Sequence, residues 1–398
     1  MRLHFYLKHF PLQQTQFGEG TSKAVHGLAM GLAQQGLAVT ILCEGPQSGS
    51  FRSPAGYQVE CFPAPTQAAS FQLSSALRHY VRSQLGPEDL VVLNGIFHPS
   101  VFRLARLLRR QQVPYVMAPH DPYHPAIFQQ RAWRKRIYWR LCEKPTLQGA
   151  QAVQLLDSRH QEWLVKRGVT TPAIALPNGL DPRDLPVTEA IYPFQTEAPR
   201  LIFLGRFDSH NKGLDLLLQG FRQFPSTRNA SLTFQGPDWG DRAALVALAE
   251  QLALGDRVRF LPPNYDTDAA VLLTQYDIFC VVSRFEGFSL SALEAMLAGR
   301  VLLISNVAGL APHVEASQCG LVVEPTIAGV QAGLEQLWQC RDQWAAMGQR
   351  GRDYAMRQLN WPTIAQQAIG HYNQVIHSPQ ANAQVPWKTR LPDEATLN

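Results

Sequence analysis

Short apolar runs recur along the chain, and most are hydrophobic at successive positions rather than at every second one. In the first half these runs are LHFYL (3–7), AVTILC (38–43), LVVLN (90–94), PYVMAP (114–119) and AVQLL (152–156). Strands buried on both faces of a parallel sheet show this continuous pattern. Between the first two runs, TSKAVHGLAMGLAQQG has helical spacing. The order strand, loop, helix, strand predicts a parallel sheet covered by helices.

The alternation of apolar runs and helical segments becomes more regular after Arg200. The second half contains RLIFLG (200–205), SLTFQG (231–236), VRFLP (258–262), DIFCVVS (277–283) and VLLIS (301–305). Helical segments are expected from about Leu214, near 241–253 and near 289–298. Repetition of the unit in both halves predicts an α/β protein with two Rossmann-like doubly wound domains.

A proline-rich segment separates the two halves. Residues 181–200 carry four prolines and no clear periodicity, as linkers between domains often do. A chain of 398 residues is also longer than one typical domain. We expect the last helical segment, WPTIAQQAIGHYNQVI, to cross back to the first domain. The predicted division is an N-terminal domain 1–182, a linker 183–199, a C-terminal domain 200–359, a crossing helix 360–376 and a polar tail 377–398.

The composition is that of a folded, mildly basic protein. Hydrophobic residues make up 45% of the chain and charged residues 17%, which excludes a largely disordered protein. A net charge of +5 suits acidic substrates or an anionic membrane surface but is weak for a nucleic-acid binder. We therefore predict no nucleic-acid partner.

Cysteine usage and the lack of long apolar segments bear on the cellular location. The six cysteines form no CxxC pair and several lie in apolar runs, as reduced cysteines of a cytosolic protein do. The N-terminal MRLHFYLKHF does not have the pattern of a signal peptide. Every apolar run is far shorter than the roughly 20 residues of a spanning helix. We predict a cytoplasmic protein that can act at the inner face of the membrane, with peripheral membrane contact only.

Two strand-to-helix loops of the second half carry charged residues that suit an anionic ligand. RFDSHNKG contains Arg206 and Lys212, and RFEGFS contains Glu286 and Gly287. Ligands of open parallel sheets bind beyond the carboxyl ends of the strands, where these loops lie. The cations attract a polyphosphate, and the helix start offers free backbone N–H groups. The residues at that helix start are Phe288, Ser289 and Leu290.

Two carboxylates stand eight positions apart in the otherwise apolar stretch SRFEGFSLSALEAMLAG. An ionised carboxylate in an apolar site is costly unless something pairs with it. Glu286 can reach the group beyond the phosphates, whereas Glu294 can accept hydrogen bonds from a ribose diol. We therefore expect hydroxyl-rich ligand groups to satisfy both acids. The alternative is that they are solvated acids at a helix edge, with Arg206 and Lys212 as ordinary surface charges.

Together these segments resemble the donor-site signature of retaining glycosyltransferases of family 4. The resemblance is carried by FLGRFDSHNKGLDLLLQGF and SRFEGFSLSALEAMLAG, where the family's E-x7-E spacing runs from Glu286 to Glu294. Arg206 and Lys212 match the basic pair that precedes it. Supporting matches are LPNGLDP (176–182), CGLVVEP (319–325) and the closing helix through Trp361 and Tyr372. The resemblance covers most of the chain and is strongest in the second half.

This resemblance implies the GT-B fold, in which two Rossmann-like domains face a central cleft. It also implies that Arg206 and Lys212 bind the donor diphosphate and stabilise the leaving group by charge. Glu294 would bind the ribose, and Glu286 would contact the sugar that is transferred with retention of its configuration. The resemblance implies no metal and no cofactor, since the nucleoside diphosphate sugar is a co-substrate.

The first half supplies further candidates through the same resemblance. His120 follows a predicted strand, where the family often has a histidine near the transferred sugar. Asp121 could orient this histidine or serve as a turn residue before Pro122. The loop through Gly18 and Gly20 resembles the family's glycine loop near the donor phosphates, with a plain turn as the alternative. The candidate catalytic residues are Glu286, His120, Arg206 and Lys212. The candidate donor-binding residues are Arg206, Lys212, Glu286, Gly287, Phe288, Ser289, Leu290, Glu294, Gly18 and Gly20.

Three positions depart from the family's pattern. Arg300 stands where a proline commonly follows LAG, and we expect the consequence to be structural. His313 lies near the position of an expected acid, and Pro262 replaces a glycine after a strand. The last two bear on contacts to the base and the sugar, so the sequence leaves the donor's identity open.

Residues 131–144, RAWRKRIYWRLCEK, combine six basic residues with Trp133, Tyr138 and Trp139. A basic aromatic helix can lie on anionic lipid. An amphipathic surface helix that uses its aromatic side chains as core is the equal alternative.

The function predicted from these features is transfer of a sugar from a nucleoside diphosphate sugar to an acceptor hydroxyl with retained configuration. We expect a carbohydrate or lipid-linked acceptor and a role in polysaccharide, lipopolysaccharide or glycolipid biosynthesis. Two alternatives stay open: a nucleotide-sugar epimerase on the same scaffold, and a non-catalytic protein that keeps the nucleotide pocket. A dehydrogenase is disfavoured because FGEGTS is a poor match to G-x-G-x-x-G.

Overall fold

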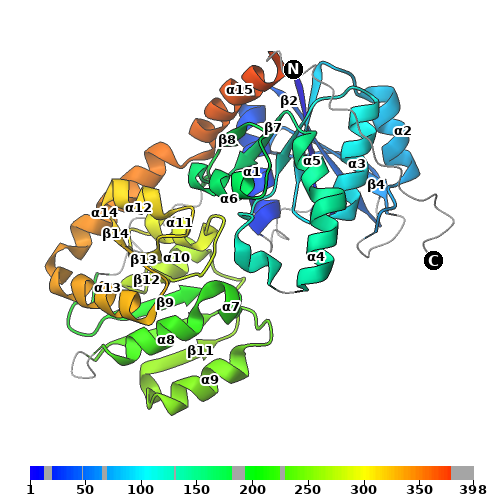
Figure 1. Ribbon diagram of the computed structural model, residues 1–398. Coiled ribbons are helices and arrows are strands. Elements are labelled where there is room, and N and C mark those ends of the chain that lie inside the picture. Colours follow the sequence, from blue (N-terminus) through cyan, green and yellow to red (C-terminus); the bar gives the residue numbers. More distant parts are fainter. Residues whose placement is uncertain are drawn as a thin grey trace.

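The fold consists of two parallel sheets, each with helices on both faces, in two domains side by side (Figure 1). The computed structural model describes residues 1–12, 20–46, 48–64, 70–129, 131–181, 193–224 and 229–377. The predicted α/β class with two doubly wound domains is confirmed. The predicted linker 183–199 and tail 377–398 lie mostly outside the described residues, and the domain boundaries stay predictions.

The first sheet has eight strands in the order β3-β4-β2-β1-β5-β6-β7-β8. They are β1 (Arg2–Tyr6), β2 (Ala38–Gly45), β3 (Gly49–Arg52), β4 (Gln58–Pro63), β5 (Asp89–Asn94), β6 (Tyr115–Ala118), β7 (Ala152–Leu155) and β8 (Ala173–Ala175). Among the described strands of this sheet, β3 and β4 at one edge are the only antiparallel pair. Along β5, Val92 packs into the core on one face, whereas Val91 and Leu93 pack on the other. Burial of both faces explains why the strand is apolar at successive positions.

The helices of the first sheet divide between its two faces. One face carries α1 (Gly20–Gln34) and α15 (Trp361–His377), and the other carries α2 (Ser75–Gln84), α3 (Pro99–Arg110) and α5 (Lys144–Gln148). Between β6 and β7 the chain forms the 3-10 turn η2 (Pro125–Phe128), α4 (Ala132–Tyr138) and the π-helical segment η3 (Trp139–Glu143). Helix α6 (Gln161–Lys166) follows β7.

The second sheet has six parallel strands in the order β11-β10-β9-β12-β13-β14. They are β9 (Arg200–Leu204), β10 (Ser231–Gln235), β11 (Val258–Leu261), β12 (Ile278–Val281), β13 (Val301–Ser305) and β14 (Gly320–Val323). The helices are α7 (Ser209–Lys212), α8 (Leu214–Arg222), α9 (Arg242–Gln251), α10 (Ala269–Leu273), α11 (Leu290–Leu297), α12 (Ala311–Ser317), α13 (Ile327–Gln339) and α14 (Trp344–Gln358). Because β9 and β12 are neighbours, the loops that follow them meet at one edge of the sheet.

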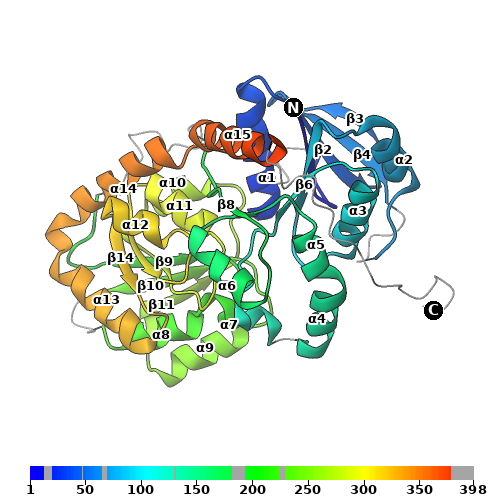
Figure 2. The ribbon, with the colours of Figure 1, turned by 45° about the horizontal axis from the view of Figure 1, so that its top comes forward.

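Helix α15 returns from the second domain to the first and lies along α1 (Figure 2). The two helices pack closely because α1 presents glycine at the contact: a Cβ added to Gly27 would lie 2.0 Å from the ring of Trp361. Further along, the Tyr372 hydroxyl donates to Oε1 of Gln154 on β7 at 2.5 Å. The end of the chain therefore ties the two domains together.

Arg300 is a buried arginine, 2% exposed, in the turn after α11. Its guanidinium donates to the carbonyl oxygens of Ala298 and Tyr276, both at 3.1 Å, and lies over the Phe194 ring. Burial lowers the pKa of Arg300 to about 10, so it stays charged at neutral pH. Since it satisfies carbonyl groups that a proline could not, the expected structural consequence of this departure is confirmed.

Within the described ranges, no helix is both long enough and apolar enough to cross a membrane.

Candidate functional site

The loop after β9 is shaped to bring Lys212 against the end of β12. Asp208 caps the short helix α7 by accepting from the Asn211 amide at 3.1 Å. Gly213 then turns the chain with a φ of +64°, and a Cβ at this position would lie 2.3 Å from the Val282 carbonyl oxygen. Only glycine allows both this backbone conformation and this close approach.

Lys212 and Glu286 form an ion pair where the loops after β9 and β12 meet. The Lys212 Nζ donates to Glu286 Oε2 at 2.5 Å, and the Ser283 hydroxyl donates to the same oxygen at 3.1 Å. Glu286 is only 8% exposed. A buried carboxylate is tolerated because it is paired and hydrogen-bonded in this way. The structure thus gives Glu286 protein partners, where the sequence led us to expect ligand hydroxyls.

Glu294 also has a protein partner, and this one comes from the other domain. It lies on α11, and one of its carboxylate oxygens accepts from Nζ of Lys23 on α1. A ribose diol that bound Glu294 would have to join or replace this contact between domains.

The first turn of α11 offers unpaired backbone donors beside these acids. The Ser289 hydroxyl caps the helix by accepting from the Ala292 amide at 3.2 Å. Among the described residues, no hydrogen bond engages the N–H groups of Phe288, Ser289 or Leu290. With the helix dipole, these donors favour an anionic group at this end of α11.

At Gly287 the backbones of the two domains lie close together. A Cβ at Gly287 would lie 2.2 Å from the carbonyl oxygen of His120, across the domain boundary. On its other side, a Cβ at Gly309 would lie 2.0 Å from the Gly287 carbonyl oxygen. The loop that carries Glu286 is therefore held between the His120 segment and the turn after β13.

His120 is fixed by Asn94 at the end of β5. The Asn94 amide nitrogen donates to the carbonyl oxygens of Tyr6 and Val92, each at 3.1 Å, so its side-chain oxygen faces His120 Nε2 at 2.8 Å. Hence Nε2 carries the proton, and Nδ1 is left as an acceptor. Burial lowers the pKa of His120 to about 4, which keeps the ring neutral.

Asp121 does not orient His120: no hydrogen bond joins the two side chains in the described part of the chain, and Asn94 holds the ring instead. Asp121 keeps an exposed surface, but desolvation by the protein atoms around it raises its pKa, and the negative charge of Glu286 raises that pKa further. Lys212 and Arg206 act in the opposite direction. Charges from both domains therefore converge here.

Arg206 takes no part in the ion pair of Lys212 with Glu286. Its guanidinium carbon is 4.2 Å from the ring centroid of Trp239, in the loop after β10. Trp239 is 62% exposed and sequence reasoning missed it, although an aromatic residue in a loop that follows a strand was a usable signal. The cation–π contact holds Arg206 at the carboxyl edge of the sheet.

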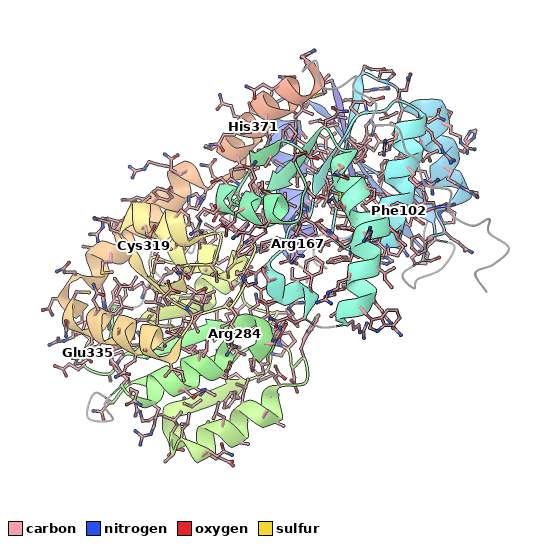
Figure 3. All side chains as sticks on the ribbon, in the orientation of Figure 1. Phe102, Arg167, Arg284, Cys319, Glu335 and His371 are labelled. Carbon is pink, nitrogen blue, oxygen red and sulfur yellow. The ribbon has the colours of Figure 1, made fainter. Side chains whose placement is uncertain are left out.

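Two further arginines that sequence reasoning missed organise the loops. Arg284, labelled in Figure 3, binds Asp215 through both terminal nitrogens at 2.8 and 2.6 Å and joins the loop after β12 to the first turn of α8. Arg159, in the 3-10 turn η4 (Ser158–His160) directly before α6, reaches into the second domain and donates to the carbonyl oxygens of Asn306 and Ala308, both at 2.9 Å. No pattern in the sequence points to this second contact, because it depends on how the domains dock.

The remaining predicted site residues are placed as follows. Gly18 lies outside the described residues. Gly20 begins α1, and a Cβ there would contact the Leu290 side chain at 3.5 Å, so α1 and α11 start side by side. His313 packs on the ring of Phe288 and lies 3.0 Å from the Tyr354 hydroxyl. Within the described ranges, no group of three or more metal-binding side chains is present.

Comparisons with known proteins cover both domains. A family model described as "Glycosyl transferases group 1" matches residues 187–354, and one described as "Glycosyl transferase 4-like domain" matches residues 19–179. The MMP alpha-(1->4)-mannosyltransferase of Mycolicibacterium hassiacum is 25% identical over 79% of this chain and 76% of its own length. The D-inositol 3-phosphate glycosyltransferase of Rhodococcus opacus is 32% identical over 37% of this chain and 31% of its own length.

Solved structures show the same architecture. Sucrose-phosphate synthase from Thermosynechococcus elongatus superposes with a TM-score of 0.74 at 21% identity, covering 94% of this chain and 98% of that one. Anabaena HepE in complex with UDP-glucose gives 0.70 at 16% identity, over 94% and 100% of the two chains. WaaG, involved in lipopolysaccharide biosynthesis, gives 0.66 at 18% identity over the same shares.

Proposed function

Because the chain belongs to the glycosyl transferases group 1 family and is a glycosyltransferase, we propose that it uses a nucleoside diphosphate sugar as donor. The sugar passes to an acceptor hydroxyl with retained configuration. The observation that carries this proposal is the meeting of Lys212, Glu286 and the free N-terminus of α11 opposite neutral His120. Cations, backbone donors and a carboxylate lie there within one edge of the sheet.

The donor's diphosphate would lie against the first turn of α11, where it accepts from the N–H groups of Phe288, Ser289 and Leu290. Lys212 and Arg206 then neutralise the charge that grows on the leaving diphosphate. When the phosphate draws Lys212 away, Glu286 becomes an acceptor for hydroxyls of the transferred sugar.

The two domains would share the rest of the donor. Glu294 exchanges Lys23 for the ribose diol, and His120 Nδ1 accepts from a hydroxyl of the transferred sugar. The acceptor binds on the first domain, and closure of the domains excludes water that would hydrolyse the donor.

We infer the donor class and the biosynthetic role from the similar solved structures. HepE binds UDP-glucose, and WaaG is involved in lipopolysaccharide biosynthesis. We assign this chain the same donor class and a role in polysaccharide, lipopolysaccharide or glycolipid biosynthesis. Residues 131–144 would contact an anionic membrane, since Trp133 and Ile137 expose more than half of their surface there.

The test begins with thermal-shift measurements on UDP-, GDP- and ADP-sugars, followed by product analysis with carbohydrate and lipid-linked acceptors. Glu294→Ala should weaken binding of the stabilising nucleotide about tenfold. Lys212→Ala should lower kcat about a hundredfold because charge stabilisation of the leaving group is lost. Lys166→Ala, on the exposed face of α6, is the matched control.

Two results contradict the proposal. Either no nucleotide sugar stabilises the protein, or both active-site variants transfer sugar at the parental rate. An epimerase would instead change the donor in the absence of any acceptor.

A further inference from the structure

A large cavity opens on the first domain between η2, the α4–η3 helix and the end of α6. Its volume is about 880 Å³. Aromatic rings and cations line it, chief among them Phe128, Arg136, Trp139, Arg140, Lys144 and Arg167. No residue of the donor site described above takes part.

Among the described residues, the cations at this cavity have no acidic partners. In the part of the chain that the structure describes, no ion pair or hydrogen bond engages the side chains of Arg136, Arg140 or Lys144. Cations that converge without counter-charge repel one another, and an anion between them relieves this repulsion. The adjacent acid, Glu143, does not neutralise these cations, because it faces inward and accepts a hydrogen bond from the Tyr123 hydroxyl at 2.6 Å.

Arg167 is held in place as a fixed wall of the cavity. Its guanidinium carbon lies 3.6 Å from the ring centroid of Phe128 and 5.6 Å from that of Trp139. Its Nε donates to the Tyr123 carbonyl oxygen at 3.3 Å, and among the described residues no hydrogen bond engages its terminal nitrogens. A stacked guanidinium of this kind is preorganised to bind oxyanions through two hydrogen bonds.

The helix that borders the cavity carries two parallel stripes. Arg136, Arg140 and Lys144 recur every four residues, and so do the apolar residues Trp133, Ile137 and Leu141. The apolar three are 64%, 52% and 44% exposed. Within α4, the three-residue offset places Trp133 and Arg136 about 60° apart around the helix axis, so cations lie beside exposed hydrocarbon. This pairing matches an amphiphile with an anionic head.

The 3-10 turn η2 at the cavity wall also contacts the candidate site, through the residue that precedes it. His124, directly before η2, stacks on Phe285 of the donor loop with ring centroids 5.7 Å apart and planes at 11°. Phe285 adjoins Glu286 in the chain. A ligand bound in the cavity therefore lies on the first domain, on the side that contacts the loop with Phe285 and Glu286.

We propose that this cavity binds the phosphate or diphosphate group of the sugar acceptor. Arg136, Arg140 and Lys144 contact the phosphate oxygens, and the exposed apolar stripe contacts hydrocarbon, which favours a lipid-linked acceptor over a free sugar phosphate. The identification of this ligand as the acceptor rests on the proposed transfer reaction.

The test compares two double variants by isothermal titration calorimetry. R136Q/R140Q removes two cations at the cavity, whereas R110Q/R134Q removes two exposed arginines outside it, one of them on the same helix. The probes are farnesyl diphosphate, inorganic pyrophosphate and uncharged farnesol. Loss of two charge-assisted hydrogen bonds should weaken binding of farnesyl diphosphate at least about tenfold in R136Q/R140Q. The control should stay within about twofold of the parent.

The probes separate the two sources of the phosphate. If the phosphate belongs to a lipid, farnesyl diphosphate should bind more tightly than pyrophosphate. The double variant I137S/L141S should then abolish this difference in affinity. A water-soluble source requires equal binding of the two. Either result supports a phosphate site, provided that farnesol does not bind.

Equal weakening in both double variants, or none in R136Q/R140Q, overturns the proposal. Stabilisation by nucleotide sugars should be unchanged in R136Q/R140Q, which shows that the donor site is intact. If the parent binds diphosphates at the cavity but no nucleotide sugar, the proposed function fails while the phosphate site stands.

Discussion

Individual side chains at this site are fixed by partners from distant strands. His120 has an unusual positive φ of +65° for a residue other than glycine, and Asn94 holds its ring. The protonation state of His120 therefore depends on Asn94 of β5 and on burial of the ring. Residues far from His120 in the sequence provide both. Lys212 and Glu286 likewise set each other's environment.

The lowered pKa of His120 makes its contribution to stability depend on pH. With a folded-state pKa of about 4 and an unfolded value of about 6.5, only the unfolded chain takes up this proton between the two values. The contribution is present above pH 6.5 and is lost as the pH falls toward 4. His120→Asn, which tolerates positive φ, should therefore lower Tm more at pH 7.5 than at pH 5.

Differential scanning calorimetry checks this, with His9→Asn on the exposed surface as the control. A Tm difference between parent and His120→Asn that does not vary with pH contradicts the assignment.

At the scale of elements, glycines set how loops and helices approach. Gly213 lets the loop after β9 touch the end of β12, and Gly27 lets α1 touch α15. The sequence showed where these helices and loops lie, but it did not show which neighbour each glycine faces.

Gly213→Ala should destabilise the fold by about 1 to 3 kcal/mol, because alanine at positive φ is strained and its Cβ would clash with the Val282 carbonyl oxygen. Thermal unfolding measures this loss. Nucleotide sugars should also stabilise the variant less, since Lys212 adjoins the strained turn. Gly370→Ala in α15 is the opposite control: its Cβ meets nothing within 4 Å, and alanine should raise helix stability slightly. Equal effects of the two variants would refute the argument.

For the molecule as a whole, contacts between the domains build the site. Lys23 pairs with Glu294 across 271 positions, and Arg159 binds carbonyl groups after β13. The Ala308 carbonyl held by Arg159 adjoins Glu286, with which Ala308 forms a β-bridge. Domain docking therefore also positions the donor loop.

Arg159→Ala should loosen this docking, because two hydrogen bonds worth about 1 kcal/mol each are lost at a partly exposed side chain. Small-angle X-ray scattering should show a larger radius of gyration, and kcat should fall as Glu286 loses its fixed position. Lys166→Ala on the following helix, α6, should change neither quantity. An unchanged radius together with parental turnover would exclude a docking role for Arg159.

The sequence by itself determined the class of the fold and the family. Continuous apolar runs between helical segments indicate strands buried on both faces, and this pattern can be read from local sequence. The predicted glycosyltransferase family and the GT-B fold are both confirmed. The edge strand β3 was missed because all four of its residues are exposed and leave no apolar run. The assigned roles of the site residues stay predictions.

Tertiary structure alone decided which of these residues meet. Lys212 reaches Glu286 across 74 positions because β9 lies beside β12 in the sheet, an order that no local pattern encodes. The partners of Glu294 and His120, and the cavity with its row of cations, also arise where separate elements pack. Periodicity records whether a residue is buried, whereas its neighbours depend on how whole strands and domains are arranged.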